Sequence, residues 1–66
     1  MEIQVNGKPV TVTEATSLAG LIEQLSLQGG RVAVEVNREI VPRSRYDATL
    51  LNSGDQVEIV QAIGGG

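Results

Sequence analysis

Only one stretch of the chain has the spacing of a helix, and this limits what the rest can form. In the segment EATSLAGLIEQLSLQGG, the apolar residues Leu18, Leu21, Ile22 and Leu25 fall at positions i, i+3, i+4 and i+7. This spacing places them in a single stripe along one helix. We expect one helix of about 11–13 residues, which can cover one face of a sheet.

Residues at both ends of this segment favour helix boundaries. Thr16 or Ser17 can cap the start by accepting a backbone N–H bond. Gly29 or Gly30 can close the end in the left-handed conformation. Gly20 lies inside the helix and weakens it by about 1 kcal/mol relative to alanine. We interpret it as a point where the helix lies close to a sheet.

The amino-terminal segment EIQVNGKPVTV alternates between apolar and polar residues, as a half-buried strand does. Asn6 and Gly7 interrupt the alternation, and both residue types tolerate the positive φ of a tight hairpin turn. Pro9 has no N–H to give to a neighbouring strand, so we expect either that this position is unpaired or that its strand lies at an edge of the sheet. A β-hairpin is therefore predicted here.

Three further strands are predicted after the helix. Residues 32–36 alternate, Asn37 and Arg38 can turn the chain, and residues 40–41 form a short return strand that Pro42 ends. Residues 56–60 give the last strand. These segments predict the order β-β-α-β-(β)-β.

This order belongs to the α+β class, with a mixed sheet of four to five strands packed on one main helix. The last strand can lie beside the first, which makes that pair parallel. The segment RSRYDATLLNSGDQ reads as irregular, with one short helical turn near Arg45 and Tyr46 and a turn cluster at residues 52–55. We expect the ring of Tyr46 to pack over this loop with its hydroxyl in water.

Composition excludes several classes of function. The 66 residues include no Cys and no His, so disulfides are impossible and a structural zinc site is not expected. Without a thiol or an imidazole, self-contained catalysis is improbable. The net charge of −3 argues against general nucleic-acid binding. The sequence shows neither a signal peptide nor a membrane span, and we expect a cytoplasmic protein.

Several charged residues are candidates for a metal or partner site. Two pairs of carboxylates flank turns, Glu35 with Glu39 and Asp55 with Glu58. Because no histidine or phosphate-binding loop accompanies them, we interpret them as solvated charges and expect no metal site. A local basic patch for a partner or an anion remains an alternative, formed by Arg38, Arg43 and Arg45.

The most unusual segment is QAIGGG at residues 61–66. Its glycines follow the last strand, so their conformational freedom weakens no element of the fold. Three extended residues reach about 10 Å and form a thread that can enter a narrow active site. The α-carboxylate of Gly66 would have to be activated by another enzyme before a nucleophile could attack it. The protein would then be a substrate, with its own terminus as the reactive group.

The residues just before the glycines are candidates for partner docking. Val60, Ala62 and Ile63 cannot all face one core if the strand alternates strictly. We therefore expect at least one of Ala62 and Ile63 to be exposed and to dock a partner that guides the tail.

The sequence resembles the ThiS family, the sulfur carriers of thiamine biosynthesis, within the ubiquitin-like β-grasp group. The resemblance covers essentially the whole chain and rests on the segments IQVNGKPV, TSLAGLIEQL, VAVEVNREIVPRSRY and LNSGDQVEIVQAI and on the final Gly65 and Gly66. VNREIVPR is the stretch most specific to this family. The closing Gly-Gly is shared with other ubiquitin-like carriers, and the family is variable at Gly64.

The resemblance implies a single β-grasp domain over residues 1–66 with a flexible glycine tail at residues 64–66. It also implies a cycle in which a ThiF-like enzyme, using ATP and magnesium, adenylates Gly66. Sulfur from a cysteine-desulfurase-type donor then gives a thiocarboxylate, which thiazole synthase, ThiG, consumes. Gly64 and Gly65 would be recognised as the tail, and the chain itself would bind no cofactor.

Three alternatives remain open. The chain could carry sulfur for molybdopterin synthesis or tRNA thiolation, which belong to the same class of function. It could be a ubiquitin-like modifier that is conjugated to lysines. It could also be an interaction module whose glycines are incidental.

Overall fold

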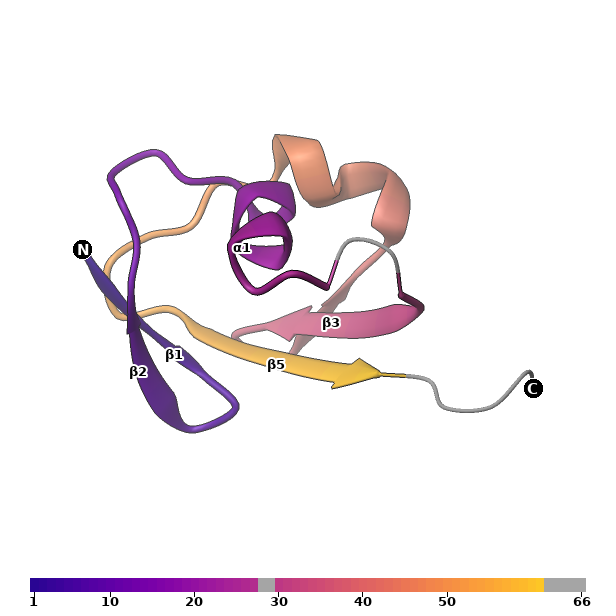
Figure 1. The fold of residues 1–66 in the computed structure, drawn as a ribbon, viewed down its shortest axis with the longest axis horizontal. Coiled ribbons are helices and arrows are strands. Elements are labelled where there is room, and N and C mark those ends of the chain that lie inside the picture. The colour runs from indigo at the N-terminus through magenta and orange to yellow at the C-terminus, as the bar shows by residue number, and fades with distance from the viewer. Residues whose placement is uncertain (28–29, 62–66) are drawn as a thin grey trace.

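The fold is a five-stranded mixed sheet with one α-helix on one face (Figure 1). The computed structural model describes residues 1–27 and 30–61. Its elements are β1 (Glu2–Val5), β2 (Lys8–Thr11), α1 (Leu18–Gln24), β3 (Val32–Val36), β4 (Glu39–Val41), a 3₁₀ helix (Arg43–Ala48) and β5 (Gln56–Gln61). The sheet order is β2-β1-β5-β3-β4. The predicted α+β class and element order are confirmed.

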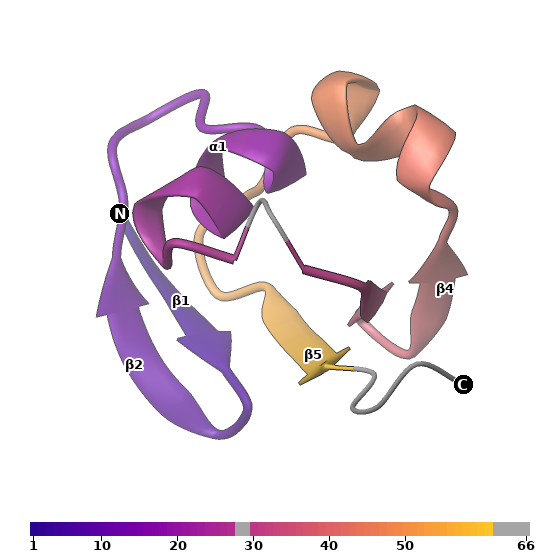
Figure 2. The ribbon, with the colours of Figure 1, turned by 45° about the vertical axis from the view of Figure 1, so that its right-hand side comes forward.

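Strand β5 joins two antiparallel hairpins, as Figure 2 shows. It pairs parallel with β1 and antiparallel with β3. Strand β2 is an edge strand, which is one of the two arrangements expected from Pro9. The parallel contact between the first and last strands is also confirmed.

Both hairpin turns have positive φ at their two central residues. The values are 51° and 81° at Asn6 and Gly7, and 51° and 69° at Asn37 and Arg38. Two such residues define the turn type whose twist matches that of paired strands. Asparagine and glycine adopt this conformation easily, whereas Arg38 does so against its preference.

The helix is shorter than the sequence predicts. It begins after Ser17, whose Oγ accepts the Gly20 N–H at 3.0 Å, and it spans seven residues. It ends because Ser26 takes a φ of 60°, and the N–H groups of Ser26 and Leu27 bond to the carbonyls of Glu23 and Ile22, both at 2.9 Å. These two bonds satisfy carbonyls that the helix leaves open.

The predicted glycine closure is therefore wrong. Gly30 follows the end of the helix and Gly29 lies outside the described residues. The interpretation of Gly20 is also corrected. A Cβ there would meet Thr16 Cγ2 at 3.3 Å and Ser17 Oγ at 3.5 Å, in the preceding turn and not in the sheet.

The core lies between α1 and the sheet. The helical stripe supplies Leu18, Leu21 and Ile22, all buried, while Leu25 is half-buried. The facing strands contribute the alternate residues Ile3, Val5, Val34, Val57 and Ile59. Among the described residues, no helix has the length and apolar character that crossing a membrane needs.

Tyr46 belongs to this core, which corrects the expectation of a ring over a loop with a wet hydroxyl. The helical turn predicted near it is a six-residue 3₁₀ helix, and it carries Tyr46 inward to 9% exposure. The hydroxyl donates to the Val32 carbonyl at 3.4 Å. This bond gives the buried O–H a partner inside the protein.

Candidate functional site

The candidate site is the end of β5, because this strand leads directly to the glycine tail. Ala62, Ile63, Gly64, Gly65 and Gly66 lie outside the described residues, so their predicted roles stay predictions. The described part of the site is β5 itself and the side chains that hold it.

Strand β5 is fixed on both sides. Its pairs with β3 run from Val36 opposite Val57 to Val32 opposite Gln61. On the other side, β1 reaches only as far as Val5, which pairs with Val57. The backbone of β5 beyond Val57 therefore has no strand beside it on the β1 side.

The side chain of Asn6 takes the place of the missing strand residue. Its Oδ1 accepts the Ile59 N–H at 2.8 Å, and its Nδ2 donates to the Ile59 carbonyl at 3.1 Å. One amide thus satisfies both backbone groups of Ile59, just as a neighbouring strand would. The turn pattern of the sequence predicts Asn6 as a turn residue only and carries no signal for this second role.

The other turn asparagine fixes the start of β5. The Asn37 N–H donates to the Gln56 carbonyl at 2.7 Å, and Asn37 Oδ1 accepts the Gln56 N–H at 3.0 Å. Asn37 Nδ2 also donates to Asp55 Oδ1 at 3.1 Å, while Asp55 Oδ2 accepts the Asn52 N–H at 2.8 Å. The two hairpin turns together hold the strand that carries the tail.

Val60 faces away from the core, as strict alternation requires. Val57 and Ile59 are 1% and 7% exposed, whereas Val60 is 65% exposed. Its partner in the ladder is Ala33 on β3, also exposed. The exposure of Val60 fits the predicted docking role, which itself stays a prediction.

The two carboxylate pairs singled out in the sequence do not face one another in the structure. Glu35 and Glu39 point to opposite faces, because Glu35 pairs with Ile40 while Glu39 pairs with Val36. Asp55 bonds to the asparagines near the start of β5, away from Glu58. Instead, Glu35 lies directly opposite Glu58. No cluster of three metal-ligating side chains occurs in residues 1–27 and 30–61.

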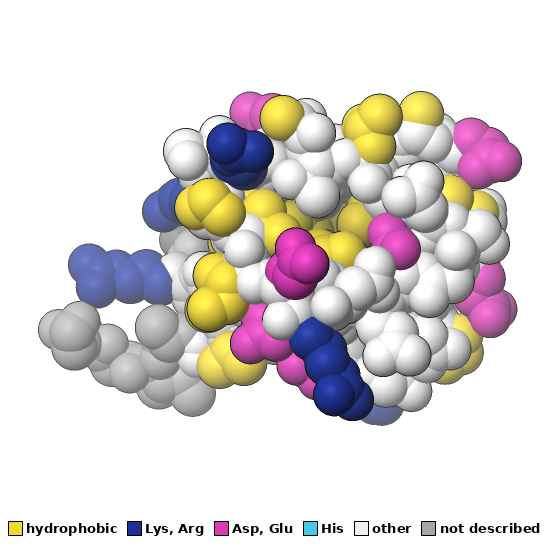
Figure 3. All heavy atoms as spheres, turned by 180° about the vertical axis from the view of Figure 1, so that it is seen from behind, with side chains coloured by type: hydrophobic (Ala, Val, Ile, Leu, Met, Phe, Trp, Pro, Cys, Tyr) yellow, Lys and Arg dark blue, Asp and Glu magenta, His cyan; other side chains and the backbone are white. Residues whose placement is uncertain are grey.

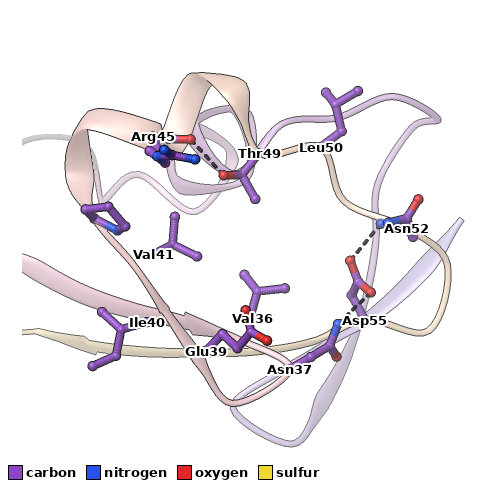
Figure 4. Close-up of a pocket in the computed structure, with 11 residues that line it drawn as sticks. Val36, Asn37, Glu39, Ile40, Val41, Arg45, Thr49, Leu50, Asn52 and Asp55 are labelled. Atoms are coloured by element: carbon purple, nitrogen blue, oxygen red, sulfur yellow. Dashed lines mark hydrogen bonds between the residues drawn. The ribbon is translucent and has the colours of Figure 1, made fainter.

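The candidate arginines do not gather into one patch. Arg45 lines a groove of about 490 Å³ between β4 and the segment after the 3₁₀ helix, whereas Arg43 lines a different hollow beside α1. Arg38 lies in the turn between β3 and β4. Figure 4 shows the groove, with the hydrogen-bonded group of Asn37, Asn52 and Asp55 at one end.

Comparison with known proteins gives consistent matches. The model of the ThiS family matches residues 3–66. The chain is 30% identical to the sulfur carrier protein ThiS of Escherichia coli, over the full length of both. It is 42% identical to a thiazole synthase of Magnetococcus marinus. That match covers all of this chain and only 20% of the length of the thiazole synthase.

A solved structure shows the same fold. The crystal structure of the thiamine biosynthesis protein ThiS from Geobacter metallireducens superposes with a TM-score of 0.85 at 40% identity, and the match covers all of both chains. The five-stranded sheet with one helix is therefore similar to the ubiquitin-like fold of that protein.

Proposed function

Because the chain belongs to the ThiS family of sulfur carriers of thiamine biosynthesis, we propose that its Gly66 carboxylate is the group that carries sulfur. A ThiF-like enzyme adenylates this carboxylate, a persulfide donor converts it to a thiocarboxylate, and thiazole synthase takes the sulfur. In this proposal the chain is a co-substrate of its partners and not an enzyme.

The proposed cycle has three chemical steps. A carboxylate oxygen of Gly66 attacks the α-phosphorus of ATP, and pyrophosphate leaves with its magnesium. The terminal sulfur of a protein persulfide, formed by a cysteine-desulfurase-type donor, then attacks the acyl-adenylate carbonyl and releases AMP. A second thiol cleaves the resulting acyl disulfide, which leaves the thiocarboxylate on Gly66 and a disulfide on the donor.

The residues of this chain fit such a passive role. The sequence has no Cys and no His, so the thiols and the acid–base groups of the cycle must come from partners. ATP and magnesium are likewise assigned to the ThiF-like enzyme. The cycle needs ATP and reduced thiols, which are available in the cytoplasm.

The observation that best supports the proposal is the way β5 is held. Its buried residues Val57 and Ile59 anchor it in the core, and pairing continues to Gln61. In the sequence, the first glycine of the tail, Gly64, follows three residues after Gln61, the last paired residue of β5. Fixing the departure point reduces the conformational freedom that must be lost when an enzyme binds the tail.

We assign the recognition of the tail to Gly64 and Gly65 and the docking of partners to Val60, Ala62 and Ile63. Glycine at position 65 leaves the thread without a Cβ, which suits a narrow active site. The exposed Val60 offers an apolar contact beside the tail.

Intact-mass measurement tests the proposal directly. The protein is incubated with the ThiF-like enzyme of the same organism, ATP, magnesium and a cysteine desulfurase with cysteine. We expect the mass to rise by the difference between sulfur and oxygen, and fragmentation to place the change on Gly66. A mass that stays constant while the enzyme remains active on another carrier would refute the carrier role.

A series at position 65 tests the steric argument. Gly65→Ala should slow formation of the thiocarboxylate, and Gly65→Val should block it, because the branched Cβ cannot enter the site. Both variants should unfold at the temperature of the wild type. Normal yield from Gly65→Val would contradict the argument, and conjugates to lysine on a denaturing gel would favour a protein modifier instead.

A further inference from the structure

The face of the sheet opposite α1 carries an exposed patch that the fold does not explain. We call it the open-face patch, and its members are Ala33, Glu35, Ile40, Glu58 and Val60. They line a hollow of about 120 Å³ on strands β3, β4 and β5. In Figure 3 the open face lies along the lower side, where hydrophobic and acidic side chains are next to one another.

The apolar part of the patch is unusually exposed. Ile40 is 77% exposed and Val60 is 65% exposed, and they are two of the three large hydrophobic side chains that stand out from the described surface. Ala33 lies opposite Val60 in the ladder. Exposed apolar side chains that cluster in this way mark interaction sites more often than isolated ones do.

The acidic part of the patch has a cost in the free protein. Glu35 and Glu58 are directly opposite one another on neighbouring strands, where like charges are destabilising. Among the described residues, neither carboxylate has an ion pair. Two apolar residues and two facing carboxylates together match a partner surface with apolar side chains around one cation.

We propose that the open-face patch binds thiazole synthase, with a Lys or Arg side chain of that enzyme placed between Glu35 and Glu58 and apolar side chains over Ile40 and Val60. The inference rests on the proposed function and names the surface that the acceptor enzyme uses. Arginine suits the position best, since its planar group can bond to both carboxylates.

Two observations favour this occupant. First, a sequence like this chain forms 20% of a protein named thiazole synthase, so the two parts are covalently joined in that relative. Second, the patch includes Val60, and the five residues from 62 to 66 can span up to about 18 Å when extended. An enzyme seated on the patch is therefore within reach of the Gly66 carboxylate.

Charge-removing variants provide the main test. The dissociation constant of purified thiazole synthase from the same organism is measured for the wild type, Glu35→Gln, Glu58→Gln and the double variant. We expect the double variant to bind about tenfold more weakly. Its affinity should also lose most of the salt dependence seen with the wild type. Glu14→Gln is the matched control, since it removes one exposed carboxylate from the loop on the helix side.

A thermal melt distinguishes a binding role from a structural one. If Glu35 and Glu58 oppose each other in the free protein, Glu58→Gln should melt higher than the wild type while it binds less tightly. Ile40→Ser and Val60→Ser should also weaken binding. Leu50→Ser is the control and should not weaken binding. Leu50 is 59% exposed, as an apolar control should be, but it lines the groove beside β4 and lies outside the open-face patch.

The outcomes separate this inference from the proposed function. Affinity for thiazole synthase within about twofold of the wild type in the double variant would overturn the patch, even if the thiocarboxylate still forms. Weaker binding only to the ThiF-like enzyme would assign the patch to that partner and reject thiazole synthase. Absence of the thiocarboxylate in the wild type, with patch binding intact, would instead reject the carrier cycle.

Discussion

The double hydrogen bond of Asn6 gives the sharpest prediction about how the tail-bearing strand is held. Asn6→Gly keeps the turn, because glycine adopts a φ of 51° without strain. It removes only the side-chain amide, which bonds to both backbone groups of Ile59. The variant therefore isolates the contribution of these two bonds from that of the turn.

The size of the effect follows from the two bonds. Each intramolecular hydrogen bond contributes about 0.5–1.5 kcal/mol net, so their loss should lower the free energy of unfolding by about 1–3 kcal/mol. For a domain of this size, each 1 kcal/mol lowers the melting temperature by about 4–8 °C. Asn6→Ala should cost about 1–2 kcal/mol more, since alanine resists the left-handed conformation.

Urea unfolding measures the loss of stability, and amide hydrogen exchange measures the loss of protection at Ile59. In Asn6→Gly, the Ile59 amide should exchange faster than the Val57 amide, although the two are similarly buried. Asn52→Ala is the control, because the Asn52 side chain forms no hydrogen bond among the described residues, and it should change stability by less than about 0.5 kcal/mol. Wild-type stability in Asn6→Gly, with Ile59 still protected, would refute the reasoning.

Two further predictions concern the start of the helix. Ser17→Ala removes the acceptor of the Gly20 N–H and should lower the free energy of unfolding by about 1 kcal/mol, with Ser17→Asn near the wild type; equal urea midpoints for Ser17→Ala and the wild type would contradict the cap. Ala15 has a φ of 63°, so Ala15→Gly should relieve backbone strain. Glycine also gives the unfolded chain more freedom, which offsets part of the gain, so the free energy of unfolding should rise by about 0.5 kcal/mol. A lower melting temperature for Ala15→Gly would show that the turn is not strained.

Local signals predicted most of the fold. Alternation and paired turn residues located the two hairpins, and the leucine stripe located the helix, because each depends on residues close together in the sequence. The parallel pair of β1 and β5 followed from placing the last strand beside the first. The exposure predicted for Ala62 or Ile63 stays a prediction, whereas the exposure of Val60 is a finding of the structure.

Interactions over long sequence distances were not predictable in this way. The bonds of Asn6 to Ile59 join residues 53 apart, and the turn preference of asparagine already explained its presence. The burial of Tyr46 is not predictable from the sequence, because a single aromatic residue in an irregular segment has no periodicity that indicates its burial. The helix end is not predictable from the glycines, because Ser26, and not a glycine, takes the left-handed conformation.

The place of β5 in the sheet has a consequence for how the protein is made. The hairpins β1–β2 and β3–β4 meet only through β5, and an isolated two-stranded hairpin is marginally stable in water. A growing chain therefore cannot complete its sheet until residues 56–61 have left the ribosome. A chain that stops before residue 56 lacks the strand that joins the two hairpins, and each hairpin alone is marginally stable.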